Sequence, residues 1–169
     1  MEKQKEANYK LFEFAESLGL VKDGSLSATS TGGERERIIH YCMEKWEEPA
    51  FDTYDFSMVV FCVGEQFSAY NRIKPSSEKA AGTVAFCADK WPNDYIMRED
   101  CLYQQLAAHK KLFTIAESDG ILAQNGTIEP KATANPREKL IYDCLAKWRY
   151  PLLHTYDFMM VMFCIEPHQ

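Results

Sequence analysis

The chain has 169 residues, 46% of them hydrophobic and 13% aromatic, which is enough to bury a core and argues against a disordered polymer. Its net charge of -6 argues against direct nucleic-acid binding, which needs clustered lysine and arginine. The longest apolar runs, residues 58–63 and 159–165, are much shorter than the roughly 20 residues of a membrane helix, so we expect no membrane span.

The N-terminal sequence and the cysteines predict the compartment. The first ten residues, MEKQKEANYK, are charged and lack the apolar stretch of a secretory signal, so we expect a cytoplasmic protein. The six cysteines are then expected to be reduced and to pack as small apolar side chains. None lies in a Cys-x-x-Cys pair or in a Cys/His cluster with zinc-site spacing, so no metal site is expected. No particular cofactor is indicated.

An internal repeat organises the chain. Roughly half of the positions from 10 to 62 recur about one hundred residues later. The recurring pairs include Lys10 and Lys111, Gly19 and Gly120, Cys42 and Cys144, Trp46 and Trp148, Asp55 and Asp157, and Cys62 and Cys164. A weaker third copy lies between them, with Cys-x-x-Lys-Trp at residues 87–91 and a further cysteine at 101. We therefore predict a single compact domain over residues 1–169, built from repeats at about 3–73, a partial unit at 74–101 and a last repeat at 102–165.

In chain order, the first predicted helix covers residues 3–18, where apolar side chains recur at helical spacing. Gly19 suits the position just after the end of this helix. The dipeptide Asp23-Gly24 between apolar residues then predicts a tight hairpin. Asn125-Gly126 predicts the same turn in the second copy.

A second helix is predicted from residue 34 to Trp46, and Pro49 prevents its continuation. Asp55 is then expected to cap a helix that reaches residue 73. The apolar runs at 58–63 and 159–165 would also suit a buried strand, but the methionines of the later run favour a helix.

The middle of the chain predicts two more helices. Ser76 or Ser77 is expected to cap a helix that ends at Trp91. Asn93 or Asp94 is expected to start a long helix that ends near residue 118.

The second copy then repeats the pattern of the first. Asn135 followed by Pro136 predicts a helix start, with asparagine as the cap and proline in the first turn. The sequence therefore predicts an all-α fold of about seven helices in two, or three, related units, with one or two short hairpins after Gly19 and Gly120.

Two duplicated pairs carry polar chemistry. Tyr54-Asp55 and Tyr156-Asp157 have the groups to grip a polar ligand or, together with His154, to carry out acid–base catalysis. The interpretation that we favour is structural, with each aspartate capping a helix and each tyrosine packing its ring.

Two other duplicated features also allow two interpretations. Arg35 and Arg137 begin their helices, and we expect them to form ion pairs with the duplicated Glu16 and Glu117; the alternative is a pair of anion-binding sites. The Cys-x-x-Lys-Trp element would activate a thiol only if its cysteine were exposed. Its presence in every copy favours a structural role instead.

The copies differ most around their tryptophans. The first copy has an acidic patch of Glu44, Glu47, Glu48 and Asp52, and the second has an aromatic and basic patch of Arg149, Tyr150 and His154 in the corresponding place. Drift of an unconstrained surface would explain the difference, but tyrosine and arginine are also typical anchors of protein interfaces. The predicted binding residues are therefore these two patches together with the two Tyr-Asp pairs.

Three classes of function follow from these features, and the motifs identify no known family. The leading class is a non-enzymatic macromolecule-binding protein, an adaptor or inhibitor whose helical surface engages a protein partner; an acidic inhibitor that covers a nucleic-acid-binding surface is one version. The alternative is a small-molecule or cofactor binder with a pocket between the duplicated halves. The third class is an enzyme that uses His154, Tyr156 and Asp157, or the thiols.

Overall fold

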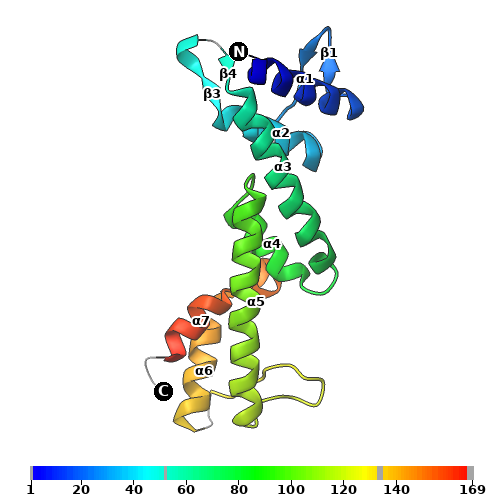
Figure 1. Ribbon diagram of the computed structural model, residues 1–169. Helices are drawn as coiled ribbons and strands as arrows, with labels where there is room; N and C mark the ends of the chain where they lie inside the picture. Colours follow the sequence, from blue (N-terminus) through cyan, green and yellow to red (C-terminus); the bar gives the residue numbers. More distant parts are fainter. Residues whose placement is uncertain (1, 52, 133–134, 167–169) are drawn as a thin grey trace. The chain divides into compact units, whose positions relative to one another are not determined.

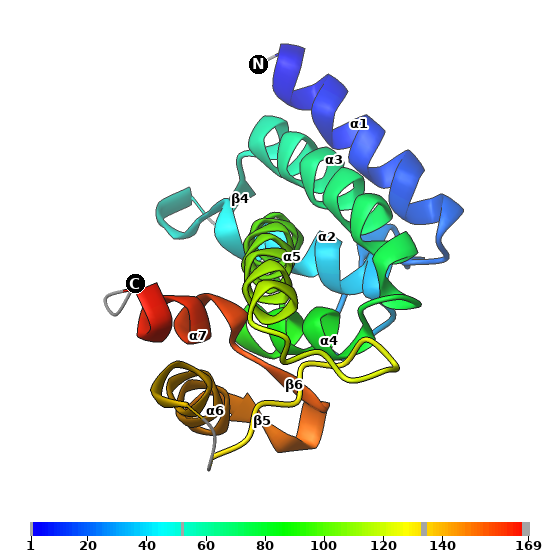
Figure 2. The same cartoon turned by 90° about the horizontal axis from the view of Figure 1, so that it is seen from below.

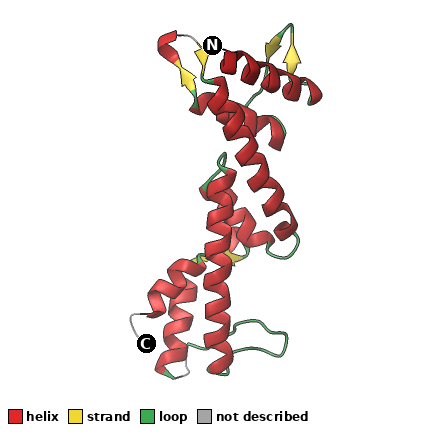
Figure 3. Cartoon of the chain, in the orientation of Figure 1, coloured by secondary structure: helices red, strands yellow, loops and turns green. Residues whose placement is uncertain are grey.

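The computed structural model describes residues 2–51, 53–132 and 135–166. In this part of the chain, seven α-helices dominate and the strands form only three two-stranded hairpins (Figures 1 and 3), which confirms the all-α prediction. The chain forms two compact units. Unit 1 comprises Met1–Lys74 and Trp91–Met97, and unit 2 comprises Pro75–Lys90 and Arg98–Gln169.

Unit 1 contains three helices and two hairpins. Its elements are α1 (Glu2–Ser17), β1 (Val21–Lys22), β2 (Ser25–Leu26), α2 (Glu34–Lys45), β3 (Glu47–Glu48), the 3-10 helix η1 (Pro49–Phe51), β4 (Thr53–Tyr54) and α3 (Phe56–Ile73). Helix α1 ends as predicted, since Gly19 adopts a left-handed φ of 71° that suits glycine. The predicted hairpin also forms, with Val21 paired to Leu26. Its turn places Asp23 and Gly24 at φ of 52° and 73°, both left-handed, as a tight hairpin turn requires.

The core of unit 1 lies where α3 packs on both α1 and α2 (Figure 2). The buried apolar residues of this cluster are Leu11, Ile39, Cys42, Val59, Cys62 and Val63. Those of α3 recur at helical spacing, so the run at 58–63 is helical, as the sequence favoured.

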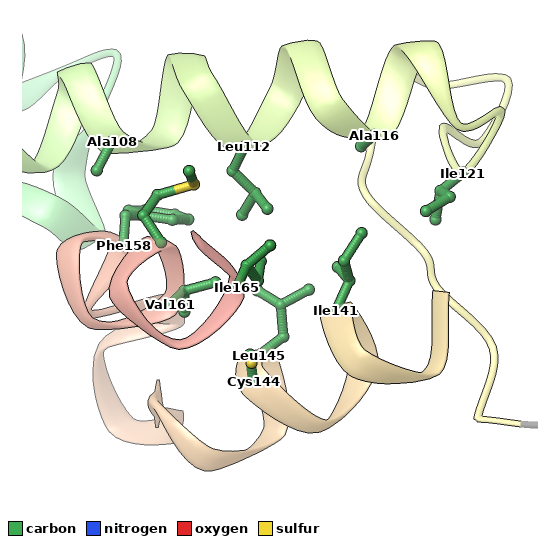
Figure 4. Close-up of a cluster of buried hydrophobic side chains, with 11 residues drawn as sticks. Ala108, Leu112, Ala116, Ile121, Ile141, Cys144, Leu145, Phe158, Val161 and Ile165 are labelled. Atoms are coloured by element: carbon green, nitrogen blue, oxygen red, sulfur yellow. The ribbon is translucent and has the colours of Figure 1, made fainter. Parts of the chain in front are cut away.

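Unit 2 holds the second copy and the middle of the chain. Its elements are α4 (Ala81–Lys90), most of α5 (Tyr95–Ser118), α6 (Pro136–Lys147), β5 (Arg149–Tyr150), the 3-10 helix η3 (Pro151–Leu153), β6 (Thr155–Tyr156) and α7 (Phe158–Ile165). A 3-10 turn, η2 (Lys74–Ser77), precedes α4. The buried side chains of α5, α6 and α7 point toward one another in a single cluster (Figure 4), with Leu112, Ile141 and Val161 fully buried.

All six cysteines form disulfides, which corrects the prediction of reduced thiols. The bonds join Cys42 to Cys62, Cys87 to Cys101, and Cys144 to Cys164. Each bond therefore links one of the two recurring cysteine positions to the other. Reduced thiols were favoured over disulfides because a reducing compartment was expected, but consecutive helices bring the two positions together.

Several predicted details of the backbone also need correction. Hairpins β3–β4 and β5–β6 were not predicted, although Pro49 and Pro151 do end their helices. The turn after Gly120 makes a single bridge, between Leu122 and Ile128, rather than a hairpin of strands. Helix α4 begins at Ala81, because residues 74–77 form the 3-10 turn instead of a serine-capped helix start.

Three glutamines hold the helix N-termini in place. Gln105 is fully buried; its Nε2 donates to Asp157 Oδ1 (2.7 Å) and its Oε1 accepts from the N–H of Phe158 (2.7 Å). Gln66 forms the same bridge, to Asp94 (3.0 Å) and to the N–H of Tyr95 (2.6 Å). Each bridge satisfies two groups at a helix start, where backbone donors lack partners within the helix.

The third glutamine forms only half of this bridge. Gln4 Nε2 donates to Asp55 Oδ1 (2.8 Å), but its buried Oε1 has no hydrogen-bond partner within the described residues.

Among the described residues, no helix is long and apolar enough to cross a membrane.

Candidate ligand-binding groove

An apolar groove of about 400 Å³ lies in unit 1 between α1 and α3. Its volume is within the range of small-molecule sites in proteins, roughly 300–1,000 Å³. The groove is lined by Lys10, Leu11, Phe14, Arg35, Val60, Val63, Gly64 and Phe67.

Helical spacing places the apolar wall of this groove. Val60, Val63, Gly64 and Phe67 follow the i, i+3, i+4, i+7 pattern of one helix face, so all four line the same side of α3. Phe14 faces them from α1, and its ring packs edge-on against Phe67 with centroids 5.3 Å apart. The wall is therefore aliphatic and aromatic along its whole length.

Gly64 keeps the groove open. A Cβ added to this residue would meet no atom within 4 Å, so the missing side chain leaves free space. Sequence reasoning missed this residue. The signal was present, since a glycine inside an otherwise strong helical pattern marks a packing or functional need.

Two cationic side chains stand at the edge of the groove. Both Lys10 and Arg35 are exposed, and Lys10 Nζ lies 2.7 Å from Glu6 Oε1 one turn earlier in α1. Within the described part of the chain, Arg35 makes no ion pair. The groove thus combines an apolar lining with one cation that is unpaired among the described residues, Arg35, and one cation paired with Glu6, Lys10.

The predicted ion pairs of the duplicated arginines are wrong. Arg137 Nε donates to Asp119 Oδ2 (2.7 Å), a residue two positions after Glu117, while Arg35 leaves Glu16 unused. Position 119 corresponds to Leu18 when the copies are aligned on their helices, so the first copy has no acid to offer Arg35 there. The two arginines therefore differ in availability although their sequence positions match.

The duplicated aspartates cap helices, as predicted. Asp55 accepts the backbone N–H groups of Ser57 (3.1 Å) and Met58 (3.2 Å). The hydrogen bond from Gln4, followed by that from Met58, lowers the pKa of Asp55. Asp55 also lines a polar recess of about 320 Å³ with Glu48 and Tyr54, among others.

In the second copy the aspartate is committed to the fold. Asp157 is buried and accepts from Gln105 and from the N–H of Met160 (3.2 Å), while Tyr156 packs its ring beside Phe158. His154 is exposed and left-handed at φ 49°. The postulated acid–base group therefore consists of a buried cap and a surface histidine, and the alternative thiol chemistry is lost to the disulfides.

The two divergent patches lie on the hairpins β3–β4 and β5–β6 and on the helices before them. Glu44, Glu47 and Glu48 are exposed, and Glu44 Oε2 lies 3.3 Å from His40 Nδ1. Asp52, the fourth predicted member of the acidic patch, lies outside the described residues. The three described members of the acidic patch therefore lie at the surface.

The second hairpin exposes an apolar residue that the sequence did not single out. Arg149, Tyr150 and His154 are exposed, and the Tyr150 ring packs edge-on against Phe86, 4.8 Å away. Leu152, which lies between Tyr150 and His154 in the sequence, keeps 94% of its surface accessible. Leu152 therefore adds a second exposed apolar side chain to this hairpin, beside Tyr150.

Comparisons with protein-family models, with curated proteins and with solved structures found no match. The functional proposal therefore rests on geometry and chemistry alone.

Proposed function

We propose that this chain is a non-enzymatic binding protein whose unit 1 holds a small elongated apolar molecule with one anionic end, such as a long-chain carboxylate. The observation that carries the proposal is the groove of about 400 Å³ between α1 and α3, apolar within and edged by Lys10 and Arg35. This is the small-molecule class of function, and the groove lies inside the first copy.

The physical basis is the division of the groove into two environments. Each buried CH₂ group of a ligand contributes about 0.8 kcal/mol, so an alkyl chain along Phe14, Val60 and Phe67 supplies most of the affinity. The carboxylate stays near solvent, where Arg35 and Lys10 attract it. Because an exposed ion pair is worth about 1 kcal/mol or less, the charge is expected to select the ligand more than to hold it.

Titration of the full chain with cis-parinaric acid, a fatty acid that fluoresces in apolar surroundings, tests the proposal. We expect saturable binding of one molecule per unit 1 and competition by dodecanoate. The variant Gly64→Leu fills the open wall and is expected to weaken binding at least tenfold, about 1.4 kcal/mol. Glu65→Leu is the matched control, because it adds the same side chain at the next, exposed position outside the groove lining.

A charge variant separates the two environments. Arg35→Gln is expected to weaken dodecanoate binding by about fivefold and to leave its methyl ester unchanged. Arg137→Gln, the corresponding change in the second copy, is expected to alter neither. Absence of saturable binding up to about 100 μM, which corresponds to about -5.5 kcal/mol, would contradict the proposed function.

We infer the compartment from the disulfides. The expected cytoplasmic location rested on the charged N-terminal sequence and implied reduced thiols, whereas three disulfides joining all six cysteines are typical of oxidising compartments. We therefore propose that the protein works in an oxidising environment. Counting thiols on protein taken from its native source, alkylated before lysis, tests this; six alkylated cysteines would contradict it.

The second candidate function is the macromolecule binding that the sequence favoured. The fully exposed Leu152, flanked by Tyr150 and by the basic Arg149 and His154, suits an acidic protein surface with an apolar pocket. Affinity capture with the intact protein is expected to retain a partner that Leu152→Asp and Arg149→Glu both release. Charge reversal of Glu47 and Glu48 is the matched control on the first hairpin, and equal loss there would remove this candidate.

A further inference from the structure

A second groove, of about 420 Å³, lies in unit 2 between α5 and α7. Its lining residues are Gln104, Ala107, Ala108, Lys111, Met159, Met160, Met162, Phe163 and Glu166. It shares no residue with the groove of unit 1, so an inference about it stands apart from the proposed function.

Methionine dominates this groove. Met159, Met160 and Met162 come from one turn of α7, and Met159 and Phe163 are 42% and 70% exposed. Ala107 and Ala108 on α5 are small, which leaves the space between the helices unfilled. Methionine side chains adapt their shape, and their sulfur atoms make favourable contacts with the edges of aromatic rings.

The charges at this groove balance. Lys111 and Glu166 are its only charged lining residues, so its formal charge is zero. Within the described part of the chain, neither of them forms an ion pair. A ligand with a net charge would therefore be attracted by one of them and repelled by the other.

We propose that the groove of unit 2 binds an uncharged aromatic molecule. The ring lies between the methionines of α7 and the alanines of α5, where it covers Phe163 and receives sulfur contacts. A polar substituent such as a hydroxyl or amine N–H is oriented by Lys111 and Glu166 at the edge. The ligand class differs from that of unit 1 because the charge balance and the wall chemistry differ.

The test uses N-phenyl-1-naphthylamine, an uncharged fluorophore that brightens in apolar surroundings, added to the full chain. The titration contains saturating dodecanoate, which occupies the groove of unit 1. We expect one bound molecule per chain. Ala107→Trp fills the groove from the exposed side of α5 and is expected to weaken binding at least tenfold. A thermal melt that matches the parent protein shows that this variant folds.

The two grooves provide each other's controls. Gly64→Leu is expected to leave N-phenyl-1-naphthylamine binding within twofold of the parent, and Ala107→Trp is expected to leave cis-parinaric acid binding equally unchanged. The anionic relative 8-anilino-1-naphthalenesulfonate is expected to bind unit 2 at least tenfold more weakly than the neutral probe. Replacing Met159 and Met160 by leucine is expected to cost the neutral probe about threefold.

Three results would overturn the inference. They are absence of a dodecanoate-resistant site, binding that ignores Ala107→Trp, and a sulfonate that binds unit 2 as tightly as the neutral probe. Failure of the fatty-acid titration leaves the second and third outcomes readable, because both can be measured without dodecanoate and depend on Ala107 and on the charge of the probe.

Discussion

The grooves of the two units lie between helices that match in sequence, but their chemistry differs. They share three aligned lining positions, Lys10 with Lys111, Val60 with Met162 and Gly64 with Glu166. In unit 1, Gly64 leaves the wall open and Arg35 leaves a positive charge available. In unit 2, Glu166 stands where Gly64 stands in the first copy, Met162 replaces Val60, and Arg137 is paired with Asp119. The difference teaches that the disulfides and helix caps that hold the helices are separate from the few residues that set the selectivity of each groove.

The framework residues support this separation. In both units a disulfide with a sequence separation of 20 joins the helix before the hairpin to the helix after it. In both, an aspartate caps the later helix and a glutamine from the first helix of the copy donates to it. The grooves are therefore free to diverge without loss of the fold.

Removal of a disulfide is expected to give the largest change in stability. For the pairs Cys42→Ala/Cys62→Ala and Cys144→Ala/Cys164→Ala, equal loop lengths predict an equal loss of about 3 kcal/mol each. Hydrogen exchange followed peptide by peptide measures each unit separately. A loss confined to one pair would show that the two frameworks are not equivalent.

The two glutamines hold corresponding sequence positions, but their replacement by alanine is expected to lower the free energy of unfolding by different amounts. Gln105→Ala leaves the buried Asp157 carboxylate and the Phe158 N–H without this partner, so we expect a loss of about 2 to 3 kcal/mol. Gln4→Ala removes one hydrogen bond from a half-buried residue, and a loss below about 1 kcal/mol is expected. Denaturant unfolding measures the loss of unfolding free energy in each variant. Equal losses in the two variants would contradict the structure.

Exchange of one groove residue is expected to transfer selectivity between the units. Gly64→Glu places the second copy's acid in unit 1, where it fills space and opposes a carboxylate, so dodecanoate should bind at least about thirtyfold more weakly, about 2 kcal/mol. In unit 2, Glu166→Gln leaves Lys111 unopposed and is expected to raise carboxylate affinity about threefold. Calorimetric titration of both variants measures the two effects, and unchanged selectivity would sink the comparison.

The units are expected to lose stability in different ranges of pH. Burial lowers the pKa of His109, whose ring packs against that of Phe158 with centroids 4.6 Å apart. As the pH falls, His109 is protonated in the unfolded chain, where a histidine has a pKa of about 6.5, before it is protonated in the folded chain. The folded state of unit 2 is therefore destabilised as the pH falls below about 6.5. His109→Gln should flatten that decline, and an unchanged pH profile of exchange in unit 2 would contradict this.

The stability of unit 1 is expected to fall at a lower pH than that of unit 2. Burial acts to raise the pKa of Asp94, but hydrogen bonds from Gln66, Tyr41 and the Met97 N–H and the charge of Lys45 lower it on balance. A lowered carboxyl pKa contributes stability above the unfolded value of about 3.9, and this is lost as the pH falls below about 4. Asp94→Asn should therefore reduce the acid sensitivity of unit 1 exchange without affecting unit 2.

The sequence predicted the elements better than the contacts between them. Helical spacing, Gly19, Asn135 and the capping aspartates are local signals, and each marked its element correctly. The disulfides and the Arg137–Asp119 pair depend on which helices meet, and no local pattern contains that information.

The candidate grooves show the same limit. Gln4 and Gln105 recur at the same spacing as Lys10 and Lys111, so the repeat already marked them, but their role as bridges needs the packed helices. Gly64 was a visible exception within a helix, yet the space beside it exists only once α1 lies along α3. Glu44, Glu47, Glu48, Arg149, Tyr150 and His154 are exposed, as mostly charged and polar side chains usually are.

Gly64 also makes heat resistance a misleading guide to this protein. Glycine inside a helix costs roughly 0.5–1 kcal/mol relative to alanine, and an added methyl group would meet no neighbour. A library screened for melting temperature alone would therefore recover Gly64→Ala early and count it as an improvement. Under the proposed function the same methyl group would narrow the groove, so a gain in melting temperature would come with weaker ligand binding.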